Sequence, residues 1–205
     1  MNGPMITIID YGRGNLRSVA KALEHLGVAN EITGEADKVQ RAERLILPGV
    51  GAFGDAMEEL GRRGLVEPIK RHVAGGRPML GICLGMQVLM EWSEEAPGVP
   101  GLGLIPGTVK RFQTRLKVPH MGWNRVRQVA PAPLFRGIPD GEYFYFVHSY
   151  YVDPIAAQQG VVAGRTEYEA DFPSVLWRGN LLATQFHPEK SQERGLQMLR
   201  NFAGI

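Results

Sequence analysis

The sequence predicts a single α/β domain built on an open, mostly parallel sheet with helices on both faces and antiparallel additions. In the first half of the chain, short apolar runs alternate with segments of helical periodicity, as in parallel strands joined by crossover helices. In the second half, strand-like runs follow one another with few helices between them, which is typical of antiparallel pairing. The 205 residues suffice for one core, and no linker divides positions 1–205.

In the first half, the apolar and β-branched runs are short enough for buried strands, and the segments between them place apolar residues three and four apart. Asn15 is expected to cap the first helix and Gly27 to end it. We expect strands at 5–9, 28–33, 44–49 and 78–82, and helices at 16–26, 34–42, 52–60, 65–73 and 84–95.

The pattern changes after the Gly- and Pro-rich segment 96–101. Short runs of strand character, separated by turns, now predominate, and we expect some of them to pair antiparallel and one to return to the main sheet. The expected strands are 107–112, 122–128, 143–152, 161–167, 175–177 and 181–186, followed by a helix at 192–202.

Composition excludes several classes of protein. The net charge is +2 and no Lys/Arg tract stands out, so the sequence gives no sign of nucleic-acid binding. No apolar run reaches the roughly 20 residues that span a membrane. The N-terminal run MNGPMITIID has no basic region and no cleavage site. One cysteine rules out an internal disulfide. We therefore expect a cytoplasmic protein without a membrane, nucleic-acid, metal or cofactor partner.

The single cysteine, Cys83, lies in the sequence GICLG between a predicted strand and a predicted helix. A strand, G-x-C-x-G and a helix form the pattern of a nucleophile elbow with Cys in place of Ser. Such a turn projects the thiol from the carboxyl edge of the sheet, and the helix N-terminus favours the reactive thiolate. A small buried hydrophobe is the alternative reading of a lone Cys, but the flanking Gly81 and Gly85 favour a nucleophile.

A cysteine nucleophile requires a base and a group that orients the base. His187 follows a strand-like run in LLATQFHPEK, and Glu189 lies two residues on, so both side chains point to one side of an extended segment. HPE alone also fits a surface turn; with the elbow in the same chain, it predicts the triad Cys83, His187 and Glu189. His25 and His72 are expected to be solvated on polar helix faces.

Glycines crowd the segment LILPGVGAFGDA directly after a predicted strand. Glycine lets a peptide turn its N–H inward or flip. We expect the Gly49–Val50 region to supply one oxyanion donor beside the amide of Leu84. A phosphate-binding loop is the alternative, but no G-K-[ST] follows the glycines.

The motifs GICLGMQ, PGVGAF and FHPEKS, in this order, resemble those of the class I (triad) glutamine amidotransferases. PHMGWN at 119–124 and YFVHSYYV at 145–152 narrow the resemblance to the glutaminase subunits of imidazole glycerol phosphate synthases. The resemblance covers essentially the whole chain. It implies that Cys83 attacks the side-chain amide of L-glutamine, that His187 protonates the leaving ammonia, and that water hydrolyses a glutamyl thioester.

The resemblance also implies substrate contacts. Gln87 lies one helical turn after Cys83 and on the same face. Glu95, near the end of the same predicted helix, is expected to pair with the substrate ammonium. The remaining expected contacts are Gly51 and the backbone of Ser149 and Tyr150.

Such subunits pass ammonia to a (β/α)-barrel cyclase that makes imidazole glycerol phosphate and AICAR in histidine biosynthesis, so we expect a heterodimer. We also expect the Gly49–Val50 peptide to reorient when that partner holds its substrate. Alternatives are another glutaminase, such as that of vitamin B6 synthesis, a stand-alone cysteine hydrolase, and a non-catalytic module. The expected interface residues are Asn15, His120, Trp123, Asn124 and Lys190.

Overall fold

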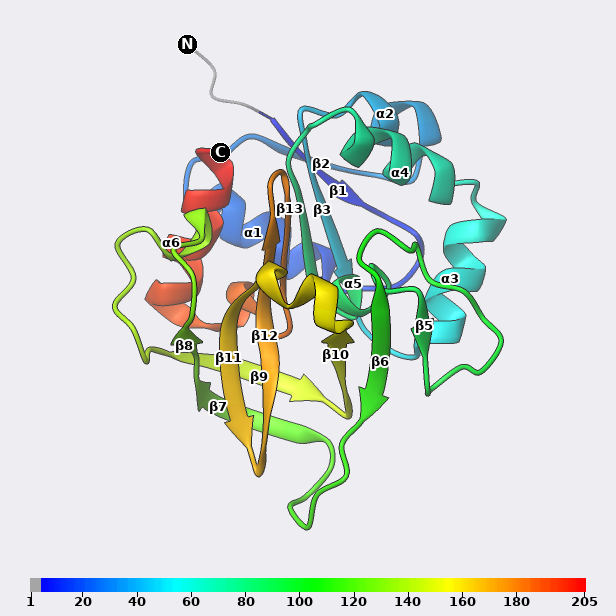
Figure 1. Cartoon of the computed structure of the whole chain (residues 1–205). Coiled ribbons are helices and arrows are strands. Elements are labelled where there is room, and N and C mark those ends of the chain that lie inside the picture. The colour runs from blue at the N-terminus through cyan, green and yellow to red at the C-terminus, as the bar shows by residue number, and fades with distance from the viewer. Residues whose placement is uncertain (1–4) are drawn as a thin grey trace.

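The computed structural model describes residues 5–205, and its centre is an eight-stranded sheet (Figure 1). The strand order is β2-β1-β3-β4-β13-β12-β11-β8. Neighbours from β2 to β13 run parallel, and β12, β11 and β8 extend the sheet antiparallel. These strands are β1 Ile6–Ile9, β2 Asn30–Thr33, β3 Arg44–Gly49, β4 Met79–Cys83, β8 Arg127–Gln128, β11 Val162–Tyr168, β12 Ala170–Arg178 and β13 Leu181–Thr184. The predicted fold class is confirmed.

Helices cover both faces of the parallel part of the sheet. Helices α1 Leu16–His25 and α6 Gln192–Ala203 pack on one face, and α2 Ala36–Arg41, α3 Phe53–Arg62 and α4 Val66–Ala74 pack on the other (Figure 1). The β1 side chains show why, since Ile8 belongs to the core beneath α1 and Ile9 to the core beneath α3. Alternate residues of a strand point to opposite faces, so an apolar strand needs a layer on each side.

Two smaller sheets lie beside the carboxyl edge of the parallel strands. One contains β10, β6 and β5, and the other pairs β7 with β9 antiparallel. Three short 3-10 segments complete the chain. The bounds are β5 Trp92–Ser93, β6 Gly107–Arg111, β7 His120–Arg125, β9 Tyr143–His148, β10 Tyr150–Pro154, η1 Pro133–Phe135, η2 Ala156–Val161 and η3 Pro188–Lys190.

The predicted helix 84–95 is wrong beyond its first turn, because α5 spans only Leu84–Gln87. The carbonyls that would continue it accept hydrogen bonds from a later loop instead: Leu102 N–H bonds Val88 O, and Leu104 N–H bonds Leu89 O. Segment 101–105 therefore competes successfully for the helical acceptors. Directly after the single turn of α5 and the residues that follow it, and before segment 101–105, the chain forms β5, which pairs parallel with β6.

Two predicted strands are each divided into two. Segment 122–128 becomes β7 and β8, and 143–152 becomes β9 and β10, with a break at Ser149. Each half joins a different sheet. Alternation along the chain indicates a strand but not the sheet that it joins.

His72 was predicted to be solvated, and this is wrong. Its ring is fully buried in α4 and bonds the carbonyl of Pro78 through Nε2 at 3.0 Å. Burial lowers the pKa of His72 to about 4, so the ring is neutral at pH 7.

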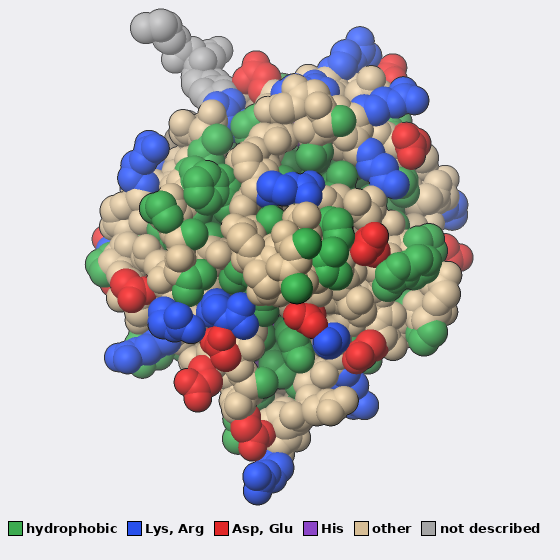
Figure 2. Space-filling view, viewed as in Figure 1, with side chains coloured by type: hydrophobic (Ala, Val, Ile, Leu, Met, Phe, Trp, Pro, Cys, Tyr) green, Lys and Arg blue, Asp and Glu red, His purple; other side chains and the backbone are tan. Residues whose placement is uncertain are grey.

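Within residues 5–205 no helix is both long and apolar enough to cross a membrane. On the face drawn in Figure 2, basic and acidic side chains are interspersed. No broad basic surface of the kind that binds nucleic acid is seen on that face.

Candidate active site

Cys83 lies at a strained turn between β4 and α5. Its backbone has φ 56° and ψ −111°, a conformation that non-glycine residues rarely adopt. Gly85 makes the turn possible, because a Cβ at that position would lie 1.8 Å from the carbonyl oxygen of Leu47. The strand–turn–helix geometry is that of a nucleophile elbow, as predicted.

His187 and Glu189 lie at the carboxyl end of β13, in and beside the 3-10 turn η3. His187 Nδ1 is 2.9 Å from Glu189 Oε1, and both side chains are almost fully buried. The segment from His187 to Glu189 was predicted to be extended, and this is wrong. The 3-10 turn η3 brings the two side chains together. A carboxylate only accepts, so Nδ1 carries the proton and Nε2 is left as the functional nitrogen.

Burial favours the neutral form of His187, but nearby groups favour the cation more strongly. Burial lowers its pKa, whereas the Cys83 sulfur and the Glu189 carboxylate raise it, and the result is a pKa raised to about 10. An imidazolium next to a cysteine stabilises the thiolate. The protonated ring of His187 therefore lies next to the Cys83 sulfur, where it can act as a proton donor.

Cys83 and His187 line one cavity of about 260 Å³. Nε2 of His187 has no hydrogen-bond partner among the described residues, which leaves it available to a ligand in this cavity. The cavity is lined by Val50, Gly51, Cys83, Leu84, Gln87, Glu95, Pro119, Val147, His148, Ser149, Tyr150 and His187. All the expected substrate-binding residues and the expected oxyanion residues Val50 and Leu84 are thus gathered around Cys83.

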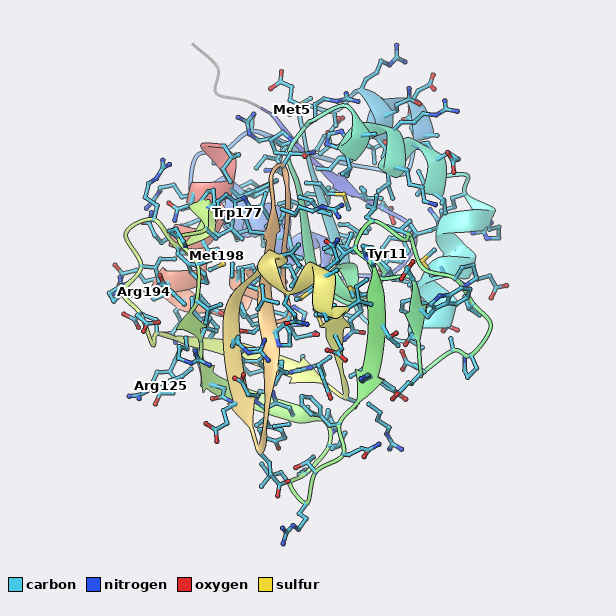
Figure 3. All side chains as sticks on the ribbon, viewed as in Figure 1. Met5, Tyr11, Arg125, Trp177, Arg194 and Met198 are labelled. Atoms are coloured by element: carbon cyan, nitrogen blue, oxygen red, sulfur yellow. The ribbon has the colours of Figure 1, made fainter. Side chains whose placement is uncertain are left out.

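Gly49 is not among the residues that line the cavity; it lies on β3, in register with Cys83 on the neighbouring strand β4. A Cβ there would lie 2.7 Å from the hydroxyl of Tyr11 and 2.8 Å from Leu84 Cβ. Tyr11, labelled in Figure 3, is buried, and burial raises its pKa above the ordinary range. Gly49 therefore lets β3 approach the elbow closely, while the exposed Val50 and Gly51, with φ 98°, form the rim.

Gln87 faces inward rather than into open solvent. Its Nε2 donates to the carbonyl of Tyr150 at 3.0 Å and to Gln185 Oε1 at 3.2 Å. Gln185 is fully buried, and its Nε2 lies 3.8 Å from Cys83 Sγ. Sequence reasoning missed Gln185, although an amide in the apolar run LLATQF two residues before His187 was a signal.

The prediction placed Glu95 near the end of a helix, and this is wrong. Glu95 reaches the cavity from a loop. Its Oε2 accepts the backbone N–H of Phe53 at 2.7 Å, at the first residue of α3. A carboxylate at a helix N-terminus is electrostatically favourable. Glu95 therefore has one structural contact and still lines the cavity.

Asn15 occupies the N-cap position of α1 but makes no side-chain cap, contrary to the prediction. Its Nδ2 lies 3.4 Å from Glu189 Oε1, and its Oδ1 accepts from Ser18 Oγ at 2.7 Å. Asn15 is thus a neighbour of the triad carboxylate.

The other expected interface residues separate into two groups. Trp123 is 46% exposed on β7, and Lys190 is exposed with its Nζ 5.9 Å from the ring centre of Tyr145. Asn124 is half-buried. His120 is buried, with 3% of its surface exposed, so its assignment to a surface interface is wrong.

Comparison with known proteins defines the class. The family model for "Glutamine amidotransferase class-I" matches residues 7–204. A solved structure titled "Crystal structure of glutamine amidotransferase" superposes with a TM-score of 0.76, at 21% identity, over 97% of this chain and 99% of that one. "Structure of PurLQS from Thermotoga maritima" gives a TM-score of 0.78 at 20% identity over 98% of both chains. The chain belongs to the class I glutamine amidotransferase family.

Curated relatives narrow the assignment within that family. "Imidazole glycerol phosphate synthase subunit HisH" of Moorella thermoacetica is 55% identical over 98% of this chain and 94% of its own. The protein of the same name from Rhodopirellula baltica is 54% identical over 97% of both. These relatives place the chain among the HisH glutaminase subunits, which serve histidine biosynthesis.

Proposed function

We propose that this chain hydrolyses L-glutamine to glutamate and ammonia with Cys83 as nucleophile, His187 as general acid and base, and Glu189 as the group that orients His187. The observation that carries the proposal is the buried 2.9 Å contact between His187 and Glu189 on the wall of the cavity that Cys83 also lines. Family membership supports glutamine as the substrate.

The reaction runs in two halves. The Cys83 thiolate attacks the side-chain carbonyl carbon of glutamine, and the imidazolium of His187 gives its proton to the departing nitrogen, which leaves as ammonia. His187, now neutral, accepts a proton from water. The resulting hydroxide attacks the glutamyl thioester and releases glutamate and the thiol. Glu189 holds Nδ1–H throughout, so that Nε2 is the nitrogen that exchanges protons.

The two tetrahedral intermediates carry a negative oxygen. We assign its stabilisation to the backbone amides of Leu84 and of the Gly49–Val50 region, because both border the cavity at the elbow. We assign the contacts with the α-ammonium and α-carboxylate groups of glutamine to Gly51, Gln87, Glu95, Ser149 and Tyr150. We further propose that the Gly49–Val50 peptide completes this arrangement only when a partner docks.

The relatives are named as subunits of a synthase, which supports a partner for this chain. We propose that the partner is a (β/α)-barrel cyclase that uses the ammonia to form imidazole glycerol phosphate and AICAR. Trp123 and Lys190 are proposed as contacts because they lie on or beside the exposed outer side of the β7–β9 pair, and Asn124 because it is half-buried next to Trp123 on β7. A cytoplasmic location suits a catalytic thiol that must stay reduced.

The test is glutamate release by the purified chain, alone and with the cyclase and its substrate. We expect slow release alone and much faster release in the complex, and we expect Cys83→Ala to abolish both. His25→Ala is the matched control, because that histidine is exposed on α1, and it should release glutamate normally. Unchanged release by Cys83→Ala would refute the nucleophile, and equally fast release without partner would indicate a free-standing hydrolase.

A further inference from the structure

Two buried histidines that the mechanism does not use face each other beside the active-site cavity. His120 on β7 and His148 on β9 are cross-strand neighbours, 3% and 5% exposed. His120 Nδ1 lies 3.0 Å from His148 Nε2. Their rings are enclosed by aromatic side chains, namely those of Phe112, Phe146, Tyr168 and Phe172.

Both rings are neutral at pH 7. Burial lowers the pKa of His120 to about 4. Burial lowers the pKa of His148 to about 3, and repulsion from His120 and His187 acts in the same direction. A neutral imidazole has one N–H and one acceptor nitrogen, so each ring donates once and accepts once.

The partners fix which nitrogen of each ring carries the proton. His148 Nδ1 lies 2.7 Å from the carbonyl of Tyr150, which only accepts, so Nδ1 of His148 is the donor. His148 Nε2 must then accept, and His120 Nδ1 must donate to it. His120 Nε2 is left as an acceptor and faces the amide nitrogen of Asn124 at 3.2 Å.

The outer end of this chain of hydrogen bonds is fixed as well. Asn124 Nδ2 also donates to the carbonyl of Glu167 at 2.8 Å, and Asn124 Oδ1 accepts the N–H of Arg125 at 2.7 Å. These two contacts allow one orientation of the amide. Every bond from Asn124 to Tyr150 therefore points inward, with each donor matched to an acceptor.

The inner end lies at the substrate cavity. The carbonyl of Tyr150 also accepts from Gln87, and Ser149 and Tyr150 line the cavity with Cys83. In an antiparallel pair of strands, hydrogen-bonded residue pairs alternate with pairs whose backbone groups point away from the partner strand. Phe112 and Ser149 form a hydrogen-bonded pair, because the Phe112 N–H donates to the Ser149 carbonyl. The neighbouring pair, Arg111 and Tyr150, therefore directs its backbone groups away from the partner strand. The Tyr150 amide is thus free of that ladder.

We propose that His148 and His120 are positioning residues for glutamine: their inward hydrogen-bond chain holds the Ser149–Tyr150 backbone where its amide receives the substrate α-carboxylate. This inference rests on the glutamine site proposed above. The same chain joins that backbone to β7, the strand that carries the exposed Trp123. Three hydrogen bonds thus connect the Asn124 amide to the Tyr150 carbonyl.

The first experiment reads the tautomers directly. Long-range proton–nitrogen NMR spectra of the full chain, labelled with ¹⁵N in the histidine rings, assign the protonated nitrogen of each ring at pH 7. We expect the Nδ1–H form for both His120 and His148, with single-histidine variants providing the assignments. The Nε2–H form or a charged ring at either position would overturn the chain, whether or not the protein uses glutamine.

The second experiment measures the consequence at Cys83 with two alkylating reagents. A diazoketone analogue of glutamine needs the α-carboxylate contact, whereas iodoacetamide needs only the thiol. We expect His148→Phe to lower the rate constant for the analogue about tenfold relative to that for iodoacetamide, the size of one lost hydrogen bond. His148→Asn places an amide N–H near Nδ1 and should restore most of the ratio. His120→Phe should give a smaller loss in the same direction.

The outcomes separate the inference from the function on which it rests. A fall in both rate constants together, or equal ratios for His148→Phe and His148→Asn, would show a structural role only and overturn the positioning role. If the wild-type chain, measured with the cyclase bound, reacts with iodoacetamide and never with the analogue, the glutamine site itself is wrong and the positioning role falls with it. A loss confined to the analogue and rescued by Asn supports the inference.

Discussion

At the residue scale, the reactivity proposed for the site depends on the hydrogen-bond partners of His187 and Glu189. His187 has Glu189 on one ring nitrogen and no described partner on the other, which directs its reactivity into the cavity. Glu189 in turn has Asn15 as a second neighbour of its bonded oxygen. Both donors reach the same carboxylate oxygen, so the Glu189 side chain is held in place and in turn fixes the orientation of the His187 ring.

We predict that Glu189→Gln lowers the rate of glutamate release by about two orders of magnitude or more, because the neutral amide no longer stabilises the His187 cation or fixes its tautomer. The titration of His187, followed by NMR, should move to lower pH in the same variant. Asn15→Ala removes a donor at 3.4 Å and should cost much less. Wild-type rates in Glu189→Gln would contradict the triad.

At the element scale, the β3–elbow–α5 packing leaves no room for side chains at its glycines. A Cβ at Gly85 would lie 1.8 Å from the Leu47 carbonyl oxygen, and one at Gly81 would lie 2.7 Å from the Gly85 carbonyl oxygen. Both obstacles are backbone atoms, which cannot rotate away. The elements that position Cys83 therefore tolerate no increase in size at these two positions.

We predict that Gly85→Ala strongly destabilises the protein or displaces the elbow, with a loss of at least about 3 kcal/mol in the free energy of unfolding. Gly61→Ala is the matched control, because Gly61 lies on α3 with open space around its Cα, and alanine favours a helix by about 1 kcal/mol. Urea unfolding measures both. Equal stability of the two variants would contradict the described packing.

At the scale of the whole molecule, buried histidines set the pH dependence of stability. His72 and His120 have pKa values lowered to about 4, and His148 to about 3. Below their ordinary pKa of about 6.5, the unfolded chain binds protons that the folded chain refuses. His187, raised to about 10, acts on the alkaline side: it stabilises the fold below about 6.5, and this contribution is lost as the pH rises through 10.

We predict that the free energy of unfolding is greatest near pH 6.5 and falls towards pH 4, with each buried neutral histidine contributing at most about 1.4 kcal/mol per pH unit. Denaturant unfolding between pH 4 and pH 9 checks this. His72→Gln should flatten the acid side of the profile without touching the active site, since His72 lies in α4 and bonds Pro78. A profile that rises steadily towards pH 4 would refute the neutral assignments.

A second prediction at this scale concerns docking. Trp123 and Trp92 are 46% and 50% exposed, but only Trp123 lies on the β7–β9 pair next to the cavity wall at Val147. We expect Trp123→Ala to weaken cyclase binding at least about tenfold, as for an aromatic hot spot, and Trp92→Ala to have no effect. Calorimetric titration with the cyclase measures both affinities, and equal affinities would exclude this face as the interface.

The sequence by itself determined the parallel half of the sheet, the elbow at Cys83 and the pairing of His187 with Glu189. Apolar runs of strand length, glycines around a single cysteine and a glutamate two residues after a histidine are local features, although a 3-10 turn and not an extended segment brings that last pair together. Gln87 and Tyr150, which the family resemblance indicated as substrate contacts, line the cavity.

Tertiary structure alone decided the rest, because the deciding partners are distant in sequence. Helix 84–95 is cut short by the loop at 101–105, which takes its carbonyls. His72 and His120 are polar in sequence and buried in the fold. The hydrogen-bond chain from Asn124 to Tyr150 exists because β7 and β9 pair in a register that places His120 opposite His148. Nothing near either histidine in the sequence specifies that register.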